Sequence, residues 1–416
     1  MFFGWVVVLV AFALATFGWG LGFYGLGIYL VELHRQHGWP IAFISSAITG
    51  YYIVGGVLVM YLGDFFARWG PRRPVLVAVG AMGAGVLGVA AATRPWHLYV
   101  ALGAMAVGWA GMSGAAVNAI VAPWFERKRG MAVSLAMNGA SAGGVLLVPL
   151  WTVLIARMGF ARAALVVVGL MLALLWPFVA LCLYRGPEAI GLRPDGVTVG
   201  SGASPAGAGS GPPAPRAAMA PLSRAALLRS LHFWSVSGTF AFALLAQVGF
   251  LTHQLTFLNP ALGLERAALA VSLTTIAAIV GRVGTGFFID RIDRRVATAC
   301  NLAVQAAALA LMLVWPSPAM LFIGSALYGL GVGNMVTFPS LIVQVEFPRE
   351  SFNQVVGLVL AVNQFTFAFG PGILGWARDR WGSYDAALLL CIAWELAAAV
   401  VVLLGMRGAR RAAAYC

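Results

Sequence analysis

Segments of roughly twenty apolar residues recur along the whole chain, and no other feature restricts the possible fold as strongly. A helix of about 20 apolar residues crosses a hydrocarbon core about 30 Å thick. Apolar runs bounded by charged residues, proline or glycine predict twelve such spans. They are residues 4–31, 41–66, 74–93, 96–121, 131–156, 161–184, 233–258, 267–289, 296–315, 319–345, 352–377 and 385–406. Because 61% of the 416 residues are hydrophobic and 9% are charged, we expect an all-α membrane protein.

Most of the 26 lysine and arginine residues lie in loops that share one side of the predicted membrane. That side also carries both termini, and the positive-inside rule makes it cytoplasmic. This placement accounts for the net charge of +13, so we expect no nucleic-acid partner. We expect a multi-pass protein of a bacterial inner membrane, surrounded by lipid, that functions as a monomer.

A long connection between the sixth and seventh predicted spans divides the chain. Residues 185–232 are rich in Gly, Ser, Ala and Pro and contain few large apolar residues, which predicts a flexible cytoplasmic linker. It joins a six-helix half at 1–184 to a second half at 233–416, which ends in a short basic tail.

The two halves resemble each other at nearly constant offsets along the chain. The matched pairs are Gly63 and Gly286, Arg68 and Arg291, Arg72 and Arg295, Gly108 and Gly333, Ala136 and Ala361, and Asn138 and Asn363. Agreement between separate regions indicates an internal duplication. Parallel repeats of this kind occur in transporters, where substrate binds between the halves near the midplane of the membrane. We therefore expect two pseudo-symmetric halves.

Two loops have related sequences, GDFFARWGPRR at 63–73 and GFFIDRIDRR at 286–295. They resemble the G-x-x-x-D-R-x-G-R-R loop of the major facilitator superfamily, although Ala67 replaces the Asp in the first copy and Asp293 a Gly in the second. The resemblance implies a network that holds one end of the transport cycle closed. Its candidate gating residues are Gly63, Asp64, Arg68, Arg72, Gly286, Asp290, Arg291 and Arg295. The alternative is that these arginines only anchor the cytoplasmic face.

A third stretch, WFERKRGMAVSLAMNGASAG at 124–143, resembles a motif of the monocarboxylate transporter family, which includes bacterial oxalate/formate exchangers. Trp124 stands where Tyr is usual and Ser134 where Gly is usual. Gly139 and Gly143 keep the small-residue spacing that allows close helix packing. The resemblance implies a major facilitator fold and a secondary transporter.

Arg282 is an arginine that falls in the middle of a predicted span, far from either end. It lies eight residues before Asp290, about 12 Å from the cytoplasmic helix end and so near the midplane. A central arginine costs at least about 2.5 kcal/mol, so it should face a cavity or a partner. Its planar guanidinium matches a carboxylate. The family it resembles carries an arginine here, four residues before the loop glycine, Gly286. A permanent ion pair with Glu395 is the alternative.

Other polar residues within the spans are weaker candidates for the substrate site. Each could line a cavity or make an interhelical hydrogen bond, and they are Tyr24, Asn118, Tyr328, Asn363 and Gln364. Two titratable residues are candidates for a proton relay, His253 and Glu395. A lone histidine is more often structural.

Differences from the family refine the substrate. Oxalate exchangers pair the arginine with a lysine in the eleventh span, where this chain has Asn363 and Gln364, and one cation favours one carboxyl group. Animal members place an Asp one turn before the arginine and a Lys in the first span. Ala278 and Phe23 stand there, so their scheme of proton coupling cannot be carried over.

These features favour a carrier for a lactate- or pyruvate-like monocarboxylate that works by alternating access and is coupled to protons. Exchange of oxalate, formate or a dicarboxylate is the alternative, and a non-transporting membrane sensor is a third possibility. The sequence has no P-loop, no catalytic constellation and no metal-ligand spacing. We therefore expect neither an enzyme nor a cofactor.

Overall fold

The computed structural model describes residues 2–184, 186–196, 224–348 and 351–413. Within these ranges twelve helices are long and apolar enough to cross a membrane, and no β-strand occurs. The all-α membrane fold expected from the sequence is confirmed. The expectation of a flexible linker falls largely on residues 197–223, which lie outside the described ranges.

The first half contains six spans, several of which are built from more than one helix. Its elements are α1 (Gly4–Trp19), η1 (Gly20–Tyr24), α2 (Gly25–His37), α3 (Ile41–Met60), α4 (Leu62–Trp69), α5 (Arg72–Ala90), α6 (Pro95–Met112), α7 (Gly114–Val121), η2 (Ala122–Trp124), α8 (Arg129–Ala142), η3 (Gly143–Leu147), α9 (Val148–Met158) and α10 (Phe160–Cys182). Three short elements follow, η4 (Pro187–Ile190), η5 (Pro194–Gly196) and α11 (Arg224–Arg229).

The second half contains the other six spans. Its elements are α12 (Leu231–Leu262), α13 (Leu264–Phe288), η6 (Ile289–Arg291), α14 (Arg294–Val314), α15 (Pro318–Val332), η7 (Gly333–Val336), α16 (Phe338–Glu346), α17 (Phe352–Phe367), α18 (Gly370–Trp381) and α19 (Asp385–Ala413).

Most helix ends lie within about one turn of the predicted ones. The first span is longer, because α2 continues to His37. In this extension Arg35 forms an ion pair with Glu32 at 2.6 Å, and Gln36 donates to the same carboxylate at 3.2 Å. Side-chain pairs three and four residues apart support a helix beyond the apolar stretch. Hydropathy alone therefore places the end too early.

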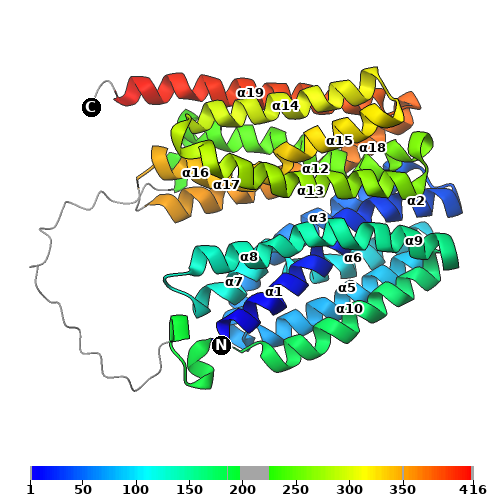
Figure 1. The fold of residues 1–416 in the computed structure, drawn as a ribbon, viewed down its shortest axis with the longest axis horizontal. Helices are drawn as coiled ribbons and strands as arrows, with labels where there is room; N and C mark the ends of the chain where they lie inside the picture. Colours follow the sequence, from blue (N-terminus) through cyan, green and yellow to red (C-terminus); the bar gives the residue numbers. More distant parts are fainter. Residues whose placement is uncertain (1, 185, 197–223, 349–350, 414–416) are drawn as a thin grey trace, which may run out of the picture.

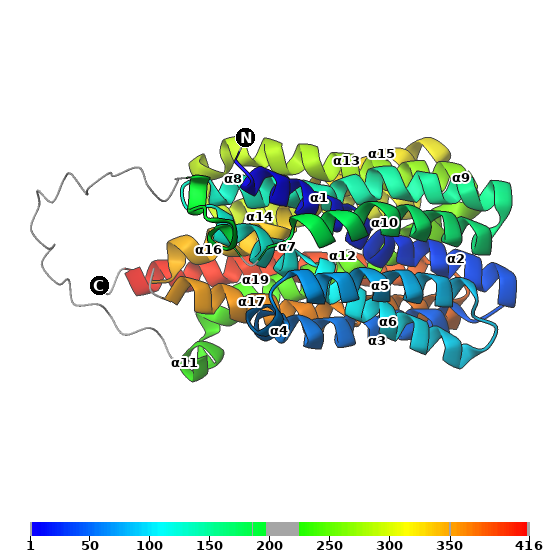
Figure 2. The same cartoon turned by 90° about the horizontal axis from the view of Figure 1, so that it is seen from below.

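The two halves lie side by side, with the helices roughly parallel to one long direction (Figures 1 and 2). The start of α1 and the last turns of α19 lie at the same end of the bundle, which we call the terminal end. The opposite end, where Gly38 follows α2 and Gly382 follows α18, is called the far end.

At the far end the two halves are in direct contact. The Asp379 carboxylate in α18 accepts a hydrogen bond from the Ala42 backbone N–H at 2.7 Å. A residue of the second half thus caps the N-terminus of α3 in the first. Close by, the Ser45 hydroxyl of α3 lies 3.3 Å from Nε2 of His253 in α12. These contacts close the bundle on this side.

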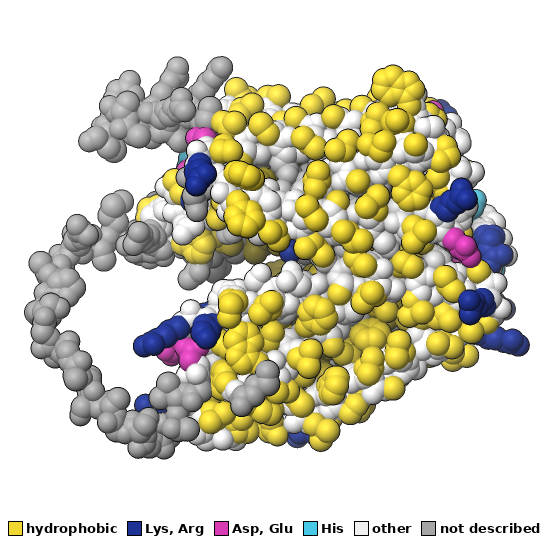
Figure 3. Space-filling view, in the orientation of Figure 1, with side chains coloured by type: hydrophobic (Ala, Val, Ile, Leu, Met, Phe, Trp, Pro, Cys, Tyr) yellow, Lys and Arg dark blue, Asp and Glu magenta, His cyan; other side chains and the backbone are white. Residues whose placement is uncertain are grey.

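At the terminal end the halves are separate. Figure 3 shows a hollow between them that opens toward this end. The buried hydrophobic residues form two clusters. The larger cluster includes residues of both halves, whereas the smaller one belongs to the second half alone. Members of this second cluster include Phe233, Phe240, Phe338 and Val402. The described conformation is therefore closed at the far end and open at the terminal end.

Candidate functional site between the halves

Two spans of the first half are interrupted by a π-helical turn at the same level, η1 in the first span and η3 in the fifth. Their glycines touch, since a Cβ added at Gly143 would overlap the Thr16 carbonyl and lie 2.8 Å from the Gly20 nitrogen. Single π-turns of this kind are frequent at functional sites. They place Tyr24, the last residue of η1, beside Gly144 of η3.

This level of the first half contacts α13 of the second half. The side chains of Tyr24 and Thr275 both lie against Gly144, 2.9 Å or less from the position of a Cβ there. The Ser272 hydroxyl lies 3.3 Å from the Gly144 carbonyl oxygen, to which it donates. Tyr24 is also close enough to Arg282 to interact electrostatically. Arg282 therefore lies where the two halves meet.

Arg282 is positioned by a close approach between α13 and the tenth span. A Cβ at Gly281 would overlap the Leu330 carbonyl, and one at Gly333 would overlap that of Ala278. The tenth span turns into the 3₁₀ segment η7 at this point, and the Gly333 carbonyl accepts a hydrogen bond from Nε of Arg282 at 3.1 Å. The side chain is anchored at Nε, and no described hydrogen bond uses its two Nη groups.

No carboxylate whose side chain the structure describes lies within 4 Å of Arg282. In particular, Glu395 in α19 does not pair with it. Glu395 is completely buried, neither of its oxygens has a described hydrogen-bond partner, and its neighbours are Tyr328 and Cys391. The half-buried guanidinium is thus available to an anion that enters from the hollow.

Several aromatic side chains lie close to Tyr24, where the halves meet. Phe23 lies 5.1 Å from Tyr24 between ring centroids and is stacked on Trp109 at 6.4 Å. From the other half, Phe367 of α17 packs edge-on against Tyr52 of α3 at 5.5 Å. The sequence analysis did not single out these aromatic residues as a group. Their one signal is that Trp19, Phe23 and Tyr24 recur at helical spacing.

The weaker candidates do not gather at one place. Gln364 lies at the junction of the halves, because its Cγ would be 2.9 Å from a Cβ placed at Gly56 of α3. Asn363 is 1% exposed, and its side-chain nitrogen and oxygen have no described partner. Asn118 is exposed on α7. Tyr328 instead lies inside the second half, 0% exposed, with its ring 4.7 Å from that of Phe250.

His253 is buried at the far end rather than beside Arg282. Its Nε2 lies 2.9 Å from the Pro371 carbonyl oxygen and its Nδ1 lies 3.0 Å from the Tyr384 hydroxyl. These partners come from α18 and from the turn before α19. The structure therefore does not bring together the two candidates for a proton relay, His253 and Glu395.

The candidate gating residues lie at the terminal end. Exposed residues are Gly63, Asp64, Arg68, Arg72, Gly286 and Arg291. The guanidinium carbon of Arg68 lies 5.4 Å from the centroid of the Trp69 ring. The backbone of Asp290 is in η6, and its side chain lies outside what the structure describes. Asp293 accepts hydrogen bonds from the N–H groups of Arg295 and Val296 and so caps α14.

Arg295 differs from the other gating candidates because it is only 2% exposed. It donates two hydrogen bonds to Glu346, at 2.6 and 2.7 Å, and one each to the Ser235 hydroxyl and the Val402 carbonyl at 2.9 Å. Burial raises the pKa of Glu346, but hydrogen bonds from Arg295 and His232 outweigh it and lower the pKa to about 2. All these partners belong to the second half.

The WFERKR motif is held by a residue that sequence reasoning missed. Asp195 of η5 accepts hydrogen bonds from the backbone N–H groups of Glu126 and Arg127, at 3.2 and 2.9 Å. These bonds, the one from Arg127 first, lower the pKa of the Asp195 carboxyl. The loop after the fourth span is thereby tied to the chain that follows the sixth.

Comparisons with known proteins agree with this architecture. The family model of the Major Facilitator Superfamily matches residues 9–371 and 262–414. The chain is 26% identical to Monocarboxylate transporter 11 of Mus musculus, over 96% of this chain and 86% of the relative. It is also 26% identical to Monocarboxylate transporter 13 of Bos taurus, over 96% and 88%.

Solved structures show the same fold at low sequence identity. The nucleoside transporter NupG superposes with a TM-score of 0.70 at 14% identity, over 98% of this chain and 99% of that one. A bacterial homologue of the human lysosomal transporter Spinster, in an inward-facing and occupied conformation, superposes with a TM-score of 0.67 at 13% identity, over 96% of each chain. With twelve candidate membrane helices in two halves and a family model that matches most of its length, this chain belongs to the major facilitator superfamily and is related at low identity to monocarboxylate transporters.

Proposed function

We propose that this protein is a secondary transporter, not an enzyme, that carries a small monocarboxylate across the membrane by alternating access. The observation on which this rests is Arg282, a half-buried arginine at the junction of the halves with no described carboxylate within ion-pairing distance. Such a charge is costly in a membrane unless it has a function. The relationship to monocarboxylate transporters supports the same substrate class.

The geometry favours one carboxyl group on a small substrate. Because Nε of Arg282 is bound to the Gly333 carbonyl, a carboxylate would be held by the two Nη groups. Tyr24 of the first half and Thr275 of the second half offer hydroxyl groups where the halves meet. The aromatic residues Phe23 and Trp109 supply an apolar wall for a short hydrocarbon part. Lactate and pyruvate each have one carboxyl group, an oxygen that can hydrogen bond with a hydroxyl group, and a short hydrocarbon part.

We propose that the described conformation is the one that faces the cytoplasm, with both termini on the cytoplasmic side of a bacterial inner membrane. Closure of the hollow would bring the exposed gating residues at the terminal end, Asp64, Arg68 and Arg291 among them, toward the opposite half. The far-end contacts of Asp379 and His253 would then open. We propose that one chain, with halves at 1–184 and 233–416 joined by residues 185–232, performs this cycle.

Proton coupling is the preferred way of driving transport, with Glu395 as the residue that carries the proton. A completely buried carboxyl group without a partner is most easily accommodated as the neutral acid. Exchange of oxalate, formate or a dicarboxylate is the second candidate, supported by the absence of a described acidic residue beside Arg282. Dependence on a pH gradient distinguishes the two.

Uptake into proteoliposomes tests the proposal. Radiolabelled lactate and pyruvate should enter with saturable kinetics, and Arg282→Ala should reduce uptake at least about 100-fold, since it removes a charged partner of the substrate. Arg282→Lys should recover only part of it, because an ammonium lacks the planar pair of donors. Arg162→Ala, which removes an exposed arginine at the far end, is the matched control.

Two results would contradict the proposal. If Arg282→Ala takes up carboxylate as well as the wild type does, Arg282 is not the residue that binds the substrate. Saturable binding without accumulation or counterflow would indicate a membrane sensor instead of a carrier. Counterflow driven by internal oxalate and insensitive to a pH gradient would favour the exchanger.

A further inference from the structure

A basic cavity lies on the outer side of the first half, away from the hollow between the halves. It has a volume of about 380 Å³ and is formed where α5 begins and α10 ends. Arg68, Arg72 and Arg73 line it together with Gly70, Leu183 and Tyr184, and none of its described lining residues is acidic. This volume falls in the range of small-molecule sites, about 300–1,000 Å³.

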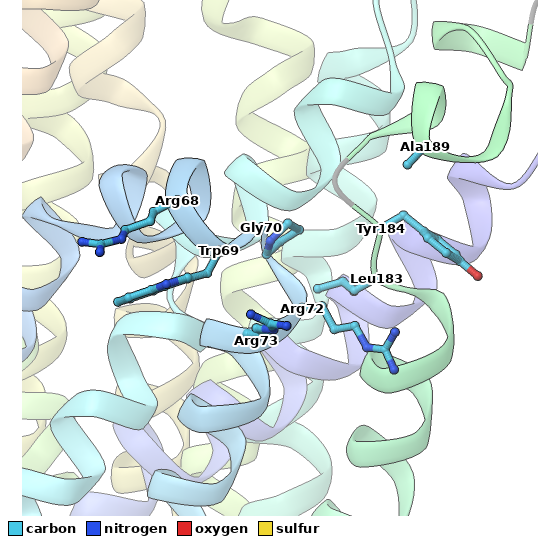
Figure 4. A pocket seen from close by; sticks show the side chains of 9 residues that line it. Arg68, Trp69, Gly70, Arg72, Arg73, Leu183, Tyr184 and Ala189 are labelled. Atoms are coloured by element: carbon cyan, nitrogen blue, oxygen red, sulfur yellow. The ribbon is translucent and has the colours of Figure 1, made fainter.

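Two of the three arginines in this cavity, Arg72 and Arg73, carry the charge available to a ligand. Neither Arg72 nor Arg73 forms an ion pair with a residue that the structure describes, and both are exposed. In Figure 4 the Arg72 side chain extends on the Leu183 side and that of Arg73 lies next to it below Gly70, whereas those of Arg68 and Trp69 extend in the opposite direction. Two adjacent arginines repel each other, and an anion between them would remove this repulsion.

The start of α5 adds to the positive potential. Arg72 is the first residue of this 19-residue helix, and Pro71 precedes it. The backbone N–H groups of Arg72 and Arg73 have no acceptor within the helix, whereas Pro74 has no N–H and the Val75 N–H donates to the Pro71 carbonyl. The N-terminus also carries a partial positive charge. Guanidinium groups and free N–H groups together favour an oxyanion such as a phosphate.

An apolar seam runs from this cavity along the membrane-facing surface. Val77, one turn after Arg73 on α5, is 63% exposed, and Leu181, one turn before Tyr184 on α10, is 69% exposed. Further along, the Trp176 ring lies over α5, 3.5 Å from the position of a Cβ at Gly80, and is 46% exposed. α5 and α10 pack against each other at the outside of the first half (Figure 2).

We propose that this cavity binds the headgroup of an anionic phospholipid, whose acyl chains lie along the seam between α5 and α10. The phosphate would bind to Arg72 and Arg73, and the hydrocarbon would cover Val77, Leu181 and the Trp176 ring. Basic pockets at the cytoplasmic ends of membrane helices recognise such headgroups. A free phosphate would contact only the arginines and leave the apolar seam uncovered, whereas a phospholipid would contact both.

Thermal unfolding of the purified full chain in detergent tests the site. Short-chain phosphatidylglycerol should raise the unfolding temperature in a saturable way, and phosphatidylcholine of the same chain length should not. Arg72→Gln/Arg73→Gln should weaken the apparent affinity for phosphatidylglycerol by about 30-fold, since each arginine contributes roughly 1 kcal/mol near a lipid surface. Lys128→Gln/Arg129→Gln, which removes two exposed charges at the same end, should leave this affinity within about twofold.

Three further measurements decide the ligand. Inorganic phosphate alone should raise the unfolding temperature only slightly. If phosphate raises it as much as the lipid does, the ligand is a free anion and the proposal is overturned. Native mass spectrometry should find one retained phosphatidylglycerol in the wild-type chain and a loss in the pocket variant. Equal retention in the pocket and control variants would also overturn it. If the glutamine variant unfolds, Arg72→Lys/Arg73→Lys keeps both charges and should retain binding within about fivefold.

Discussion

Nε2 of His253 lies 2.9 Å from the carbonyl oxygen of Pro371. Because a carbonyl can only accept, Nε2 must carry a hydrogen, and in the neutral ring Nδ1 is then the acceptor for the Tyr384 hydroxyl at 3.0 Å. Ser45 of the other half lies 3.3 Å from the same Nε2. Both ring nitrogens are therefore occupied at the contact between the halves, which supports a structural role for His253 in far-end closure.

Replacement of His253 should weaken this closure. His253→Ala removes the ring that links the Pro371 carbonyl to the Tyr384 hydroxyl. Loss of the partner of the buried Tyr384 hydroxyl costs about 1–3 kcal/mol. We expect a lower unfolding temperature and greater reactivity of a cysteine introduced at Ser45 toward thiol reagents added at the far end. His37→Ala, which removes an exposed histidine at that end, is the control. Unchanged stability and reactivity in His253→Ala would contradict the structural role.

The fold was predictable because each span carries its own signal. Twenty apolar residues specify a membrane helix whatever its neighbours are, and the repeated loops add the two-half arrangement. The interruptions of the helices were not predictable. GLGFY in η1 and GGVLL in η3 have the composition of ordinary small-residue packing segments, and hydropathy does not distinguish a π-turn from an α-turn.

The site was predictable only where a residue is out of place in an apolar span. Arg282 stands out for that reason, and the structure places it between the halves. Aromatic residues such as Phe23 and Trp109 do not stand out, because aromatic side chains are common in membrane helices. The Asp379 contact with Ala42 joins residues 337 positions apart, and no local pattern encodes such a distant pair.

The close approach of α13 and the tenth span gives a test of how Arg282 is positioned. A Cβ at Gly281 would overlap the Leu330 carbonyl, so Gly281→Ala must push the two elements apart and displace Arg282, the next residue. Misplacement of about 1 Å can reduce activity about 100-fold. We therefore expect the KM for carboxylate uptake to rise at least about tenfold, with little loss of folded protein.

The same helix contains the control for this substitution. Gly284 lies about one turn after Gly281, and a Cβ there would have nothing within 4 Å. Gly284→Ala should leave uptake unchanged and stabilise the helix by about 0.5–1 kcal/mol. Equal changes in KM for the two variants would show that the approach at Gly281 does not position the arginine.

The ion pair between Arg295 and Glu346 predicts a dependence of stability on pH. The pKa of Glu346 is about 2 in the folded protein, below its ordinary value of 4.5. The unfolded chain therefore binds this proton more readily, and the stabilisation is complete above about pH 4.5 and is lost as the pH falls toward 2. Glu346→Gln should cost roughly 3 kcal/mol at neutral pH, because it leaves a buried arginine without its counter-ion.

Unfolding temperatures measured between pH 7 and pH 2.5 check this prediction. The difference between wild type and Glu346→Gln should be largest at neutral pH and should shrink below pH 4.5. Glu126→Gln, at an exposed carboxyl group near the same end, should show no such trend. A difference that stays constant across the range would mean that the Glu346 charge does not stabilise the fold.

The last prediction separates proton coupling from substrate binding. Glu395 is completely buried in α19, with Tyr328 and Cys391 as its titratable neighbours, and it is not paired with Arg282. Glutamine has the shape of the neutral acid but cannot release a proton. Glu395→Gln should therefore fold normally and still exchange carboxylate in counterflow, since Arg282 is intact. Uptake driven by a pH gradient should fall at least about tenfold, while Glu265→Gln, at an exposed site of α13, should leave it unchanged. If gradient-driven accumulation persists in Glu395→Gln, either another group carries the proton or the protein is an exchanger. The ratio of gradient-driven uptake to counterflow, measured in the same vesicles, distinguishes these two outcomes.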